Sequence, residues 1–503
     1  AYAYYNNQEY ENALPLFEGI SYRNTEIAQS ALYHLGDCYL KTGDKNKARI
    51  AFSKAANMDF DPKIQQDALF NFAKVTFELS YSPFNEAIRA LELYIRSYPA
   101  ADNTDEAYNY LVTAYLGTRN YSMAMTSLEK IRRKDANIER AYQKVAFYRG
   151  LELYKNLRFA EAVDALEVSM KYSGYDAVIT ARTYFWLGEA AYRTGDRKTA
   201  RMYYNQFLSD SRAYQQQEYA LVHYSMGYIY FDEESYGDAI DWFGKFLRQA
   251  EGQSSASVSD AYNRIGDCYF VQTQYTRAID YYNRSISAGM ADADYAMFQK
   301  GFTLGLLDRT QEKVDVLNQL SSEQPRSAFV DDALFEIGRS YVVLNQPQQA
   351  IGYYKRVIDE HASSSYTNNA LNQLGLIHYN AGDYTDALVY YEQVATNFPG
   401  TPEAENALTS IKNIYVRNDN VDGYAAFVTG LGRDITRSEQ DSLSYTAAEM
   451  IYMRDDCEGT IRAFIDYLDA FPQGRYLLNA HYYKEDCQLK LQQNNEALES
   501  LDY

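Results

Sequence analysis

The stretch LGDCYLKTGDKNKARIAFSKA, residues 35–55, decides the fold because its pattern returns later in the chain as IGDCYFVQTQYTRAIDYYNRS, residues 265–285. An Asp beside a Cys could belong to a redox or metal site. The two copies, however, also agree at small and aromatic positions well beyond GDCY. The matched positions are Gly36, Tyr39, Ala48 and Phe52 in the first copy and Gly266, Tyr269, Ala278 and Tyr282 in the second. Such a frame, repeated at identical offsets, predicts a structural repeat rather than a reactive motif.

The same frame recurs along the chain, and the Ala position is its most regular member. Anchored on that position, the chain divides into about fourteen units, each with two helices of about a dozen residues joined by a short polar turn such as TGD or AGD. The anchors are Ala13, Ala48, Ala87, Ala124, Ala162, Ala200, Ala239, Ala278, Lys313, Ala350, Ala387, Tyr424, Thr460 and Ala497. Lys313, Tyr424 and Thr460 are not small, so the units around residues 294–325 and 404–472 have the least defined register.

A Gly inside the first helix of unit after unit needs a packing reason, since Gly costs about 1 kcal/mol relative to Ala in a helix interior. The expected reason is close contact between the two helices of a unit, with the Gly of the first facing the Ala of the second. The large residue four positions after the Ala is then expected to fill the space toward the next unit. A pair of helices this small cannot bury its apolar face alone, so the units must stack.

The frame resembles the tetratricopeptide repeat (TPR), whose pattern runs from an apolar residue and Leu-Gly through Tyr to Ala, a large apolar residue, a second Ala and a closing Pro. In the first copy these positions are Leu35, Gly36, Tyr39, Ala48, Phe52 and Ala55. The resemblance covers essentially the whole chain. It implies an all-α fold, a right-handed α-solenoid of stacked helix-turn-helix units.

The expected organisation is an N-terminal part, residues 1–250, and a C-terminal part, residues 260–503, which together form one continuous solenoid. Two Ser-containing polar stretches, residues 251–259 and 432–444, are either domain breaks or lengthened turns between units. The chain starts inside the first helix of one unit and stops inside the second helix of another. Because solenoids end in polar capping elements, we expect it to be a segment of a longer protein.

Charge and composition exclude several classes of function. The formal charge of −20 disfavours nucleic acid, which is bound through clustered Lys and Arg. No stretch approaches the 18 apolar residues of a membrane-spanning helix. The five histidines and four cysteines show no zinc spacing, and the phosphate-binding and nucleophile motifs of common enzymes are missing. We therefore expect no enzyme activity, no cofactor and no metal.

The cysteines have a structural interpretation. Cys38, Cys268 and Cys487 lie two residues after the Gly position, where other units carry Ala, so each is expected to be a small core residue. Cys457 begins a second helix, and antiparallel packing would bring it near Cys487. A disulfide between these two remains an open alternative to two free thiols.

The resemblance implies that first helices line the concave surface, where the residues three before, one after and four after the Gly face a partner. In the middle of the array these positions are rich in aromatic residues: Phe147, Tyr154, Phe185, Tyr192, Tyr224, Tyr228 and Phe231. One hypothesis is that this stripe anchors a partner. The alternative is that the rings pack between adjacent first helices. The Lys and Asn with which some TPR proteins hold a C-terminal carboxylate are missing, because Asp37 and Glu189 stand in the corresponding places.

We therefore expect a non-catalytic scaffold that binds protein partners, through an extended apolar or basic segment or a subunit of an envelope complex, and that binds no nucleic acid. Pro325 and Pro399 lie two units apart, which gives 37 residues per unit. Long units with an aromatic-Pro turn resemble TPR proteins of Gram-negative envelopes, the outer-membrane assembly lipoprotein and Tol-Pal coordinator families. That resemblance implies the periplasm, with a possible lipid tether outside this chain. A glycan or peptidoglycan binder and a cytoplasmic regulatory TPR protein are the alternatives.

Overall fold

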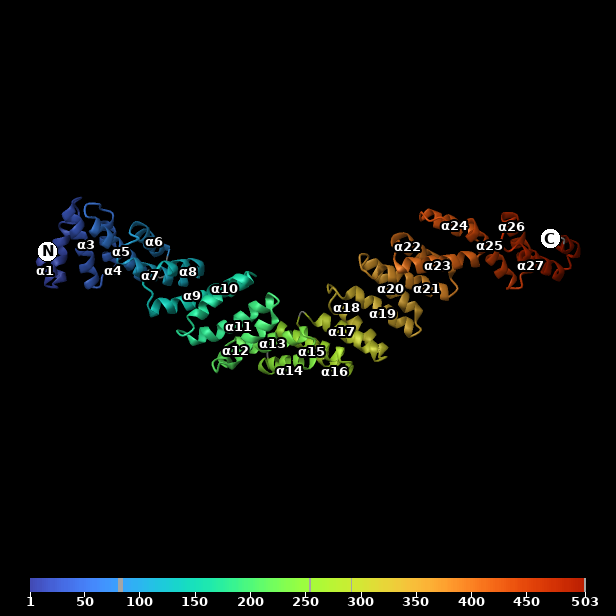
Figure 1. The fold of residues 1–503 in the computed structure, drawn as a ribbon, viewed down its shortest axis with the longest axis horizontal. Helices are drawn as coiled ribbons and strands as arrows, with labels where there is room; N and C mark the ends of the chain where they lie inside the picture. The colour runs from blue at the N-terminus through green and yellow to red at the C-terminus, as the bar shows by residue number, and fades with distance from the viewer. Residues whose placement is uncertain (80–84, 253–254, 291, 502–503) are drawn as a thin grey trace. The chain divides into compact units, whose positions relative to one another are not determined.

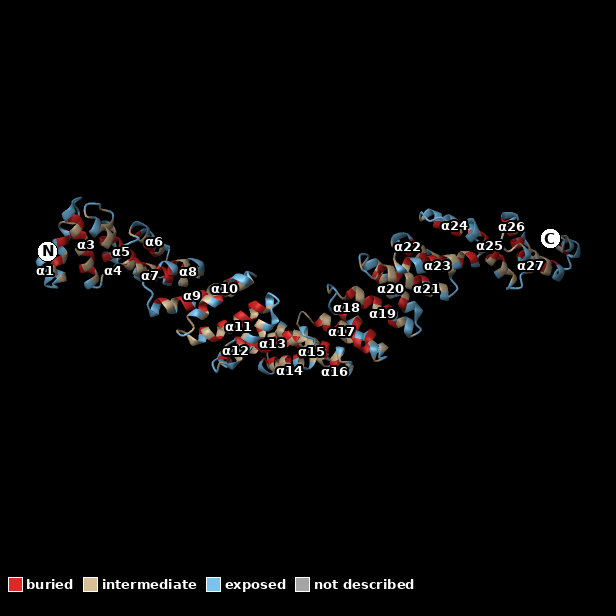
Figure 2. Ribbon diagram, in the orientation of Figure 1, coloured by how far each residue is buried: buried red, intermediate tan, exposed pale blue. Residues whose placement is uncertain are grey.

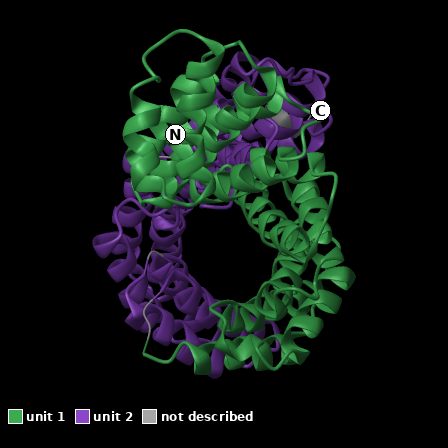
Figure 3. Ribbon diagram, turned by 90° about the vertical axis from the view of Figure 1, so that its left-hand side faces the viewer, with its two compact units in different colours: residues 1–253 green, residues 254–503 purple. Residues whose placement is uncertain are grey.

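The computed structural model describes residues 1–79, 85–252, 255–290 and 292–501. The chain divides into two compact units, residues 1–253 and 254–503, shown in separate colours in Figure 3. Within the described residues every regular element is a helix (Figure 1). The expected all-α architecture of helix pairs is confirmed.

The described part of the first unit contains fourteen α-helices and one 3₁₀ turn. They are α1 (Tyr2–Asn6), α2 (Tyr10–Glu18), α3 (Glu26–Lys41), α4 (Lys45–Ala56), α5 (Pro62–Leu79), α6 (Asn85–Ser97), α7 (Thr104–Gly117), α8 (Tyr121–Lys130), α9 (Ala136–Lys155), α10 (Phe159–Lys171), α11 (Ala177–Arg193), α12 (Arg197–Ser209), η1 (Ala213–Gln215), α13 (Glu218–Asp232) and α14 (Tyr236–Gln249).

The described part of the second unit contains fourteen further α-helices. They are α15 (Ala256–Val271), α16 (Tyr275–Ala288), α17 (Ala293–Leu306), α18 (Thr310–Glu323), α19 (Val330–Val343), α20 (Pro347–Glu360), α21 (Thr367–Asn380), α22 (Tyr384–Asn397), α23 (Pro402–Arg417), α24 (Val421–Gly430), α25 (Arg437–Tyr452), α26 (Cys457–Ala470), α27 (Leu477–Lys490) and α28 (Asn494–Leu501).

Odd-numbered and even-numbered helices alternate as first and second helices of the repeat, and every anchor from Ala13 to Ala497 lies in a second helix. Within each of the two units, helices that follow one another in the chain pack together, so buried residues run along the helix interfaces (Figure 2). Of the two candidate breaks, residues 251–259 include residues 253–254, which lie outside the described residues. Residues 432–444 lie inside the second unit, and α25 already begins at Arg437.

The TGD and AGD turns end one helix and start the next by a shared geometry. Gly43, Gly195 and Gly382 adopt φ angles of +88°, +88° and +80°, which suit Gly because it has no Cβ. The Asp that follows caps the second helix: the side chains of Asp44, Asp196 and Asp383 accept the backbone N–H of the residue three positions on. The turn sequence is therefore explained by backbone requirements alone.

The Gly of the first helix lies beneath a large side chain of the second. A Cβ atom on Gly188 would approach the ring of Tyr204 to 2.5 Å, and one on Gly266 would approach Tyr282 to 2.6 Å. Eight units share this contact, with the pairs Gly36–Phe52, Gly150–Leu166, Gly188–Tyr204, Gly227–Phe243, Gly266–Tyr282, Gly301–Leu317, Gly338–Tyr354 and Gly375–Tyr391. The prediction that the Gly faces the anchor Ala is thus corrected: the side chain four residues after the Ala occupies that place.

The three anchors that are not small are accommodated in different ways. Lys313 is buried, and its ammonium pairs with Glu336 of α19. Thr460 is fully buried, and its hydroxyl donates to the backbone oxygen of Asp456 at 2.7 Å. Tyr424 lies in α24, which has only ten residues. The register of these units is therefore the expected one, although the packing at each anchor differs.

The cysteines fall into two classes. Cys457 at the start of α26 and Cys487 of α27 form a disulfide, with their Cα atoms 4.9 Å apart. Cys38 and Cys268 are free and buried. Burial raises the pKa of the Cys38 thiol to about 11 and that of Cys268 to about 12, so both remain protonated at neutral pH. Of the two alternatives for Cys457 and Cys487, a disulfide or two free thiols, the structure shows the disulfide.

In the described part of the chain, none of the helices combines the length and the apolar character needed to cross a bilayer.

Candidate binding site

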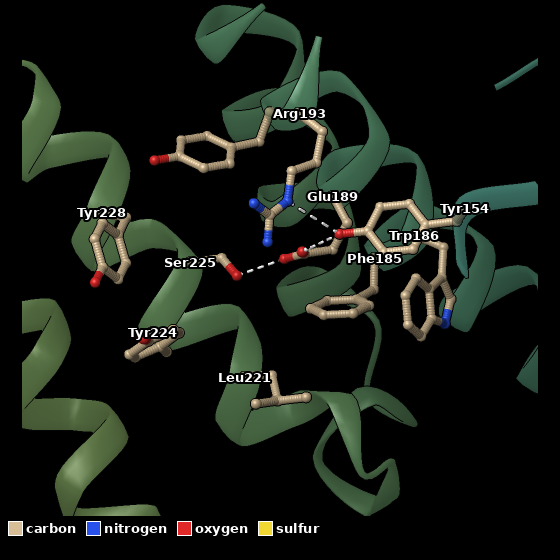
Figure 4. Close-up of a pocket in the computed structure, with 10 residues that line it drawn as sticks. Tyr154, Phe185, Trp186, Glu189, Arg193, Leu221, Tyr224, Ser225 and Tyr228 are labelled. Carbon is tan, nitrogen blue, oxygen red and sulfur yellow. Dashed lines mark hydrogen bonds between the residues drawn. The ribbon is translucent and has the colours of Figure 1, made fainter. Parts of the chain in front are cut away.

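A pocket of about 470 Å³ opens between three successive first helices of the first unit, α9, α11 and α13 (Figure 4). We call it the aromatic pocket. Its lining is Tyr154, Phe185, Trp186, Glu189, Tyr192, Arg193, Leu221, Tyr224, Ser225 and Tyr228. Six of these ten side chains are aromatic, so the walls are largely apolar.

The repeat itself brings these side chains together. Phe185, Glu189 and Tyr192 are spaced by about one helical turn and share one face of α11. On α13, Tyr224 and Tyr228 occupy the frame positions that Phe185 and Glu189 occupy on α11. Stacking the two helices side by side therefore places like positions opposite each other, and the crevice between them becomes the pocket.

Glu189 lies on the floor of the aromatic pocket and accepts three hydroxyl hydrogen bonds. The hydroxyl of Tyr154 donates to Oε2 at 3.0 Å, that of Tyr204 donates to Oε1 at 2.8 Å, and that of Ser225 also donates to Oε1. The donors come from α9, α12 and α13, so one carboxylate connects three consecutive repeats. Burial, followed by the charge of Glu189, raises the pKa of both tyrosines.

The other charged group of the aromatic pocket is Arg193. Its Nε donates to the hydroxyl of Tyr154 at 3.4 Å, and its side chain extends between Tyr154 and the α13 side of the pocket (Figure 4). Arg193 and Glu189 balance each other, so the lining carries no net formal charge. Hydrogen bonds connect Arg193, Tyr154, Glu189 and Ser225, and these polar groups are suited to orient a ligand rather than to attract one by charge.

Ring contacts hold the walls in place. The indole of Trp186 meets the ring of Tyr154 edge-on, with centroids 5.2 Å apart, and its Nε1 donates to Glu218 at 3.3 Å. Glu218 is buried and pairs with Arg182 at 2.7 Å. On the opposite wall the rings of Tyr224 and Tyr228 are 5.1 Å apart. The walls are therefore preorganised.

Five of the seven predicted stripe residues line this pocket: Tyr154, Phe185, Tyr192, Tyr224 and Tyr228. Phe185 is almost fully buried, so little of its ring is accessible to a ligand. Phe231 lies outside the pocket lining, against Tyr228 and Tyr236. Whether the five residues bind a partner stays a prediction.

Phe147 requires a correction. Its side chain is fully buried and packs in a cluster with Leu166, Ile179 and Leu187. The guanidinium carbon of Arg182 lies 5.2 Å from the ring centroid and covers it. The ring therefore belongs to the core and cannot face a partner, as the packing alternative expected.

Sequence reasoning missed four lining residues: Trp186, Arg193, Leu221 and Ser225. It selected positions three before, one after and four after the Gly. The missed residues lie at neighbouring positions, two or six before and five after the Gly. A crevice between two first helices exposes the flanks of each helix as well as its centre. The missed residues also lie at fixed offsets from the Gly, so the repeat pattern could have identified them.

The Asp of GDCY lies one position after the Gly, where the resemblance implies that a side chain faces a partner, and the structure corrects this at Asp267. That side chain is buried, its Oδ1 accepts the hydroxyls of Tyr282 and Tyr295 at 2.9 Å each, and its Oδ2 lies 2.7 Å from Arg264. In the first copy, Asp37 accepts the hydroxyl of Tyr5 at 2.7 Å. Acidic residues one position after the Gly thus bind tyrosines of the same unit and of neighbouring units.

Among the described residues, one cluster has potential metal ligands. The Nδ1 of His378 lies 3.2 Å from Asp383 and 3.8 Å from Asp386. Both carboxylates are exposed, and Asp383 already caps α22. The geometry alone gives this cluster no function beyond the cap.

Comparison with known families identifies the repeat. One tetratricopeptide-repeat model matches residues 1–63, 224–293 and 335–402, and a second matches residues 182–211. These segments carry tetratricopeptide repeats, and the same alternation of first and second helices is present in the described parts of both units. No curated protein matches it.

Several solved structures are similar to the chain. The C-terminal part of a TPR repeat-containing protein from Cytophaga hutchinsonii is 15% identical, with 52% of this chain and 99% of that one covered and a TM-score of 0.45. A tetratricopeptide repeat protein from Parabacteroides merdae is 12% identical, with coverage of 54% and 98% and a TM-score of 0.33. YrrB, described as a TPR protein with an unusual peptide-binding site, is 22% identical, with coverage of 38% and 92% and a TM-score of 0.31.

Proposed function

We propose that this protein is a non-catalytic scaffold in a cell-envelope complex, which holds an extended segment of a protein partner on the surface formed by its first helices. The repeat architecture is itself suited to protein–protein interaction. The observation that supports binding of an extended segment is the aromatic pocket, a single crevice to which three consecutive repeats contribute aromatic side chains. Its occupant is an aromatic or large aliphatic side chain of the partner segment.

The pocket fits such a side chain in size and chemistry. A space of about 470 Å³ accommodates one large side chain together with part of the backbone that carries it. Tyr and Trp are rigid contact residues that bury large areas with little loss of conformational entropy. Because Glu189 is already bonded to three hydroxyls, burying an apolar group beside it does not leave its oxygens without partners.

The experiment uses Trp186 as a reporter. The chain has two tryptophans, so Trp242→Phe leaves Trp186 as the only one. Twelve-residue peptides are selected by the protein from a displayed random library, and their binding is then followed by Trp186 fluorescence. We expect an aromatic or large aliphatic residue in the selected peptides. Its replacement by Ser should weaken binding at least tenfold, because burial of such a side chain stabilises by about 1.5–3 kcal/mol.

Leu221→Lys provides the structural test, because Leu221 lines the pocket while its side chain is 40% exposed. A lysine ammonium at this wall of the pocket would lose water when an apolar side chain binds beside it, so affinity should fall at least fivefold with helicity unchanged. Met202→Lys is the matched control, since Met202 is 46% exposed on α12 and outside the pocket. Equal binding by both variants would contradict the proposal. A fluorescence change with soluble peptidoglycan fragments but not with peptides would favour the glycan alternative.

We also propose that the protein works in the periplasm, with any lipid tether outside this chain. The Cys457–Cys487 disulfide supports this, because structural disulfides persist in oxidising compartments and are rare in the cytosol of mesophiles. Rapid acid quenching of cells, alkylation and mass spectrometry measure the oxidation state of the pair. Oxidised cysteines in native cells support the proposal, and a fully alkylated, reduced pair contradicts it.

A further inference from the structure

A second pocket, of about 760 Å³, borders α9 at the end of α7 and the start of α8. Its lining includes Arg119, Lys144, Lys155, Tyr121, Tyr148 and Glu152, and we call it the basic pocket. The ring of Tyr121 stacks on that of Tyr148 with centroids 5.5 Å apart and an interplanar angle of 15°. The stacked pair forms one flat wall beside the cations.

The basic pocket reverses the charge of the chain locally. Three cations and one carboxylate line it, which gives a formal charge of +2 where the chain as a whole carries −20. Within the described residues, Arg119, Lys144 and Lys155 lie in no ion pair. The one carboxylate, Glu152, is already paired with Arg149 at 2.6 Å. The three cations are therefore not neutralised by the protein itself.

The net charge of the chain does not cancel this local charge. At physiological ionic strength the Debye length is about 8 Å, so acidic residues elsewhere on the surface are largely screened. An anion that enters the basic pocket interacts mainly with its lining. A pocket that collects charge of one sign also raises the local concentration of its counterion.

The basic pocket and the aromatic pocket share α9. Tyr154 lines the aromatic pocket, and the next residue, Lys155, lines the basic pocket. An extended segment that places a large side chain in the first pocket therefore passes beside the second. The aromatic pocket has no net formal charge, so any preference of the two pockets for a negatively charged segment comes from the basic pocket.

We propose that the basic pocket binds side-chain carboxylates of the partner segment, so that the segment carries Asp or Glu close to its aromatic or aliphatic anchor. This inference rests on the proposed function and specifies its partner. It replaces the basic segment that the acidic composition suggested. The carboxylates would bind to Lys144, Lys155 and Arg119, and the Tyr121–Tyr148 wall would cover the aliphatic part of the acidic side chains.

Two labelled fourteen-residue peptides test the proposal by fluorescence anisotropy. Both contain one Phe, and one has three Glu beside it where the other has three Gln. We expect the Glu peptide to bind the full chain at least tenfold more tightly at 50 mM NaCl and the preference to fall to about twofold at 500 mM, since salt screens exposed charges. Lys144→Glu/Lys155→Glu should remove the preference, and Lys144→Arg/Lys155→Arg should retain it.

The control is Lys171→Glu/Lys198→Glu, which makes the same change in net charge at exposed lysines on α10 and α12, outside both pockets. If this control loses the preference equally, binding follows net charge and the inference is wrong. It is also wrong if the two peptides bind alike, or if anionic phospholipid vesicles bind and the Glu peptide does not. Binding of both peptides that depends on Leu221 but not on Lys144 would leave the proposed function standing without the acidic segment.

Discussion

Tyr282 of α16 and Tyr354 of α20 occupy the same place in the repeat, yet their hydroxyls have opposite environments. Both rings are fully buried, and each covers a glycine of the preceding helix: Tyr282 lies over Gly266, and Tyr354 lies over Gly338. The hydroxyl of Tyr282 donates to Asp267, whereas that of Tyr354 is buried without a hydrogen-bond partner. The residue after the glycine makes the difference, because it is Asp in one unit and Arg in the other.

The comparison separates two roles of one position. The ring fills the space over the glycine in every such unit, and this packing is common to the family of repeats. At Tyr282 the hydroxyl stabilises as well, because a carboxylate stands at the next position of the first helix. The same pairing recurs at Tyr204 and Glu189 beneath the aromatic pocket. A position can thus keep its residue type while its polar group contributes very different free energies.

Removing the ring should have the largest effect on stability and should abolish the difference between the Tyr282 and Tyr354 sites. Tyr282→Ala and Tyr354→Ala each leave a cavity in a packed interface, and we expect each to lower the free energy of unfolding by about 3–5 kcal/mol. Urea unfolding of the full chain, followed by circular dichroism, measures both. A loss below 1 kcal/mol at either site would show that the ring is not the packing element.

Adding a methyl group beneath the ring tests the glycine. A Cβ on Gly266 or Gly338 would lie 2.6 Å from the ring above it, so the ring must move. We expect Gly→Ala at each site to destabilise by about 2 kcal/mol, because overpacking outweighs the better helix propensity of Ala. Gly352 on α20 has open space around its Cβ, so Gly352→Ala is the control and should be neutral or stabilising. Destabilisation by this control alone would refute the interpretation.

Removing only the hydroxyl should separate the two sites. Tyr282→Phe takes one hydrogen bond from the buried Asp267 and should cost about 1.5 kcal/mol. Tyr354→Phe removes a buried hydroxyl that has no partner and should be neutral or slightly stabilising. The two variants are compared under identical conditions in urea. Equal costs at both sites would mean that the carboxylate contributes nothing.

Over the first pH unit above 10, alkaline titration gives the smallest effect. Burial, and then the charge of Asp267, raises the pKa of Tyr282 above its ordinary value near 10. The folded state therefore keeps this proton longer than the unfolded state. Stability from the tyrosine is complete below pH 10 and is lost as pH rises above it, by about 1.4 kcal/mol per pH unit for one group. Tyr282→Phe should reduce the slope of stability against pH above 10 by that amount, and an unchanged slope would contradict the assignment.

The repeat frame was predictable because the fold depends on it directly. Gly, Ala and a large residue at fixed offsets allow two helices to pack closely, and the Ala position alone marks eleven of the fourteen units in the sequence. The direction of the contact was not predictable from spacing alone. Gly188 is close in the frame to both Ala200 and Tyr204, and only the geometry of the crossing helices places the ring over it.

The candidate site was predictable in part for the same reason. Tyr154 and Tyr224 occupy frame positions that face the crevice, and the structure places both there. Phe147 occupies the same frame position as Tyr224 but is covered by Arg182 from the next first helix. What a frame position faces depends on the neighbouring unit, and one unit's sequence does not contain that information.

The disulfide between α26 and α27 also has a mechanical consequence. In a repeat array each unit contacts only its neighbours, so a pulling force separates units one after another from the loaded end. Cys457 belongs to the repeat formed by α25 and α26, and Cys487 belongs to the next repeat, formed by α27 and α28. Their bond therefore crosses the boundary at which these two repeats would separate. A load applied to α27 is therefore transmitted covalently to α26, and these two helices cannot be pulled fully apart until the bond is reduced.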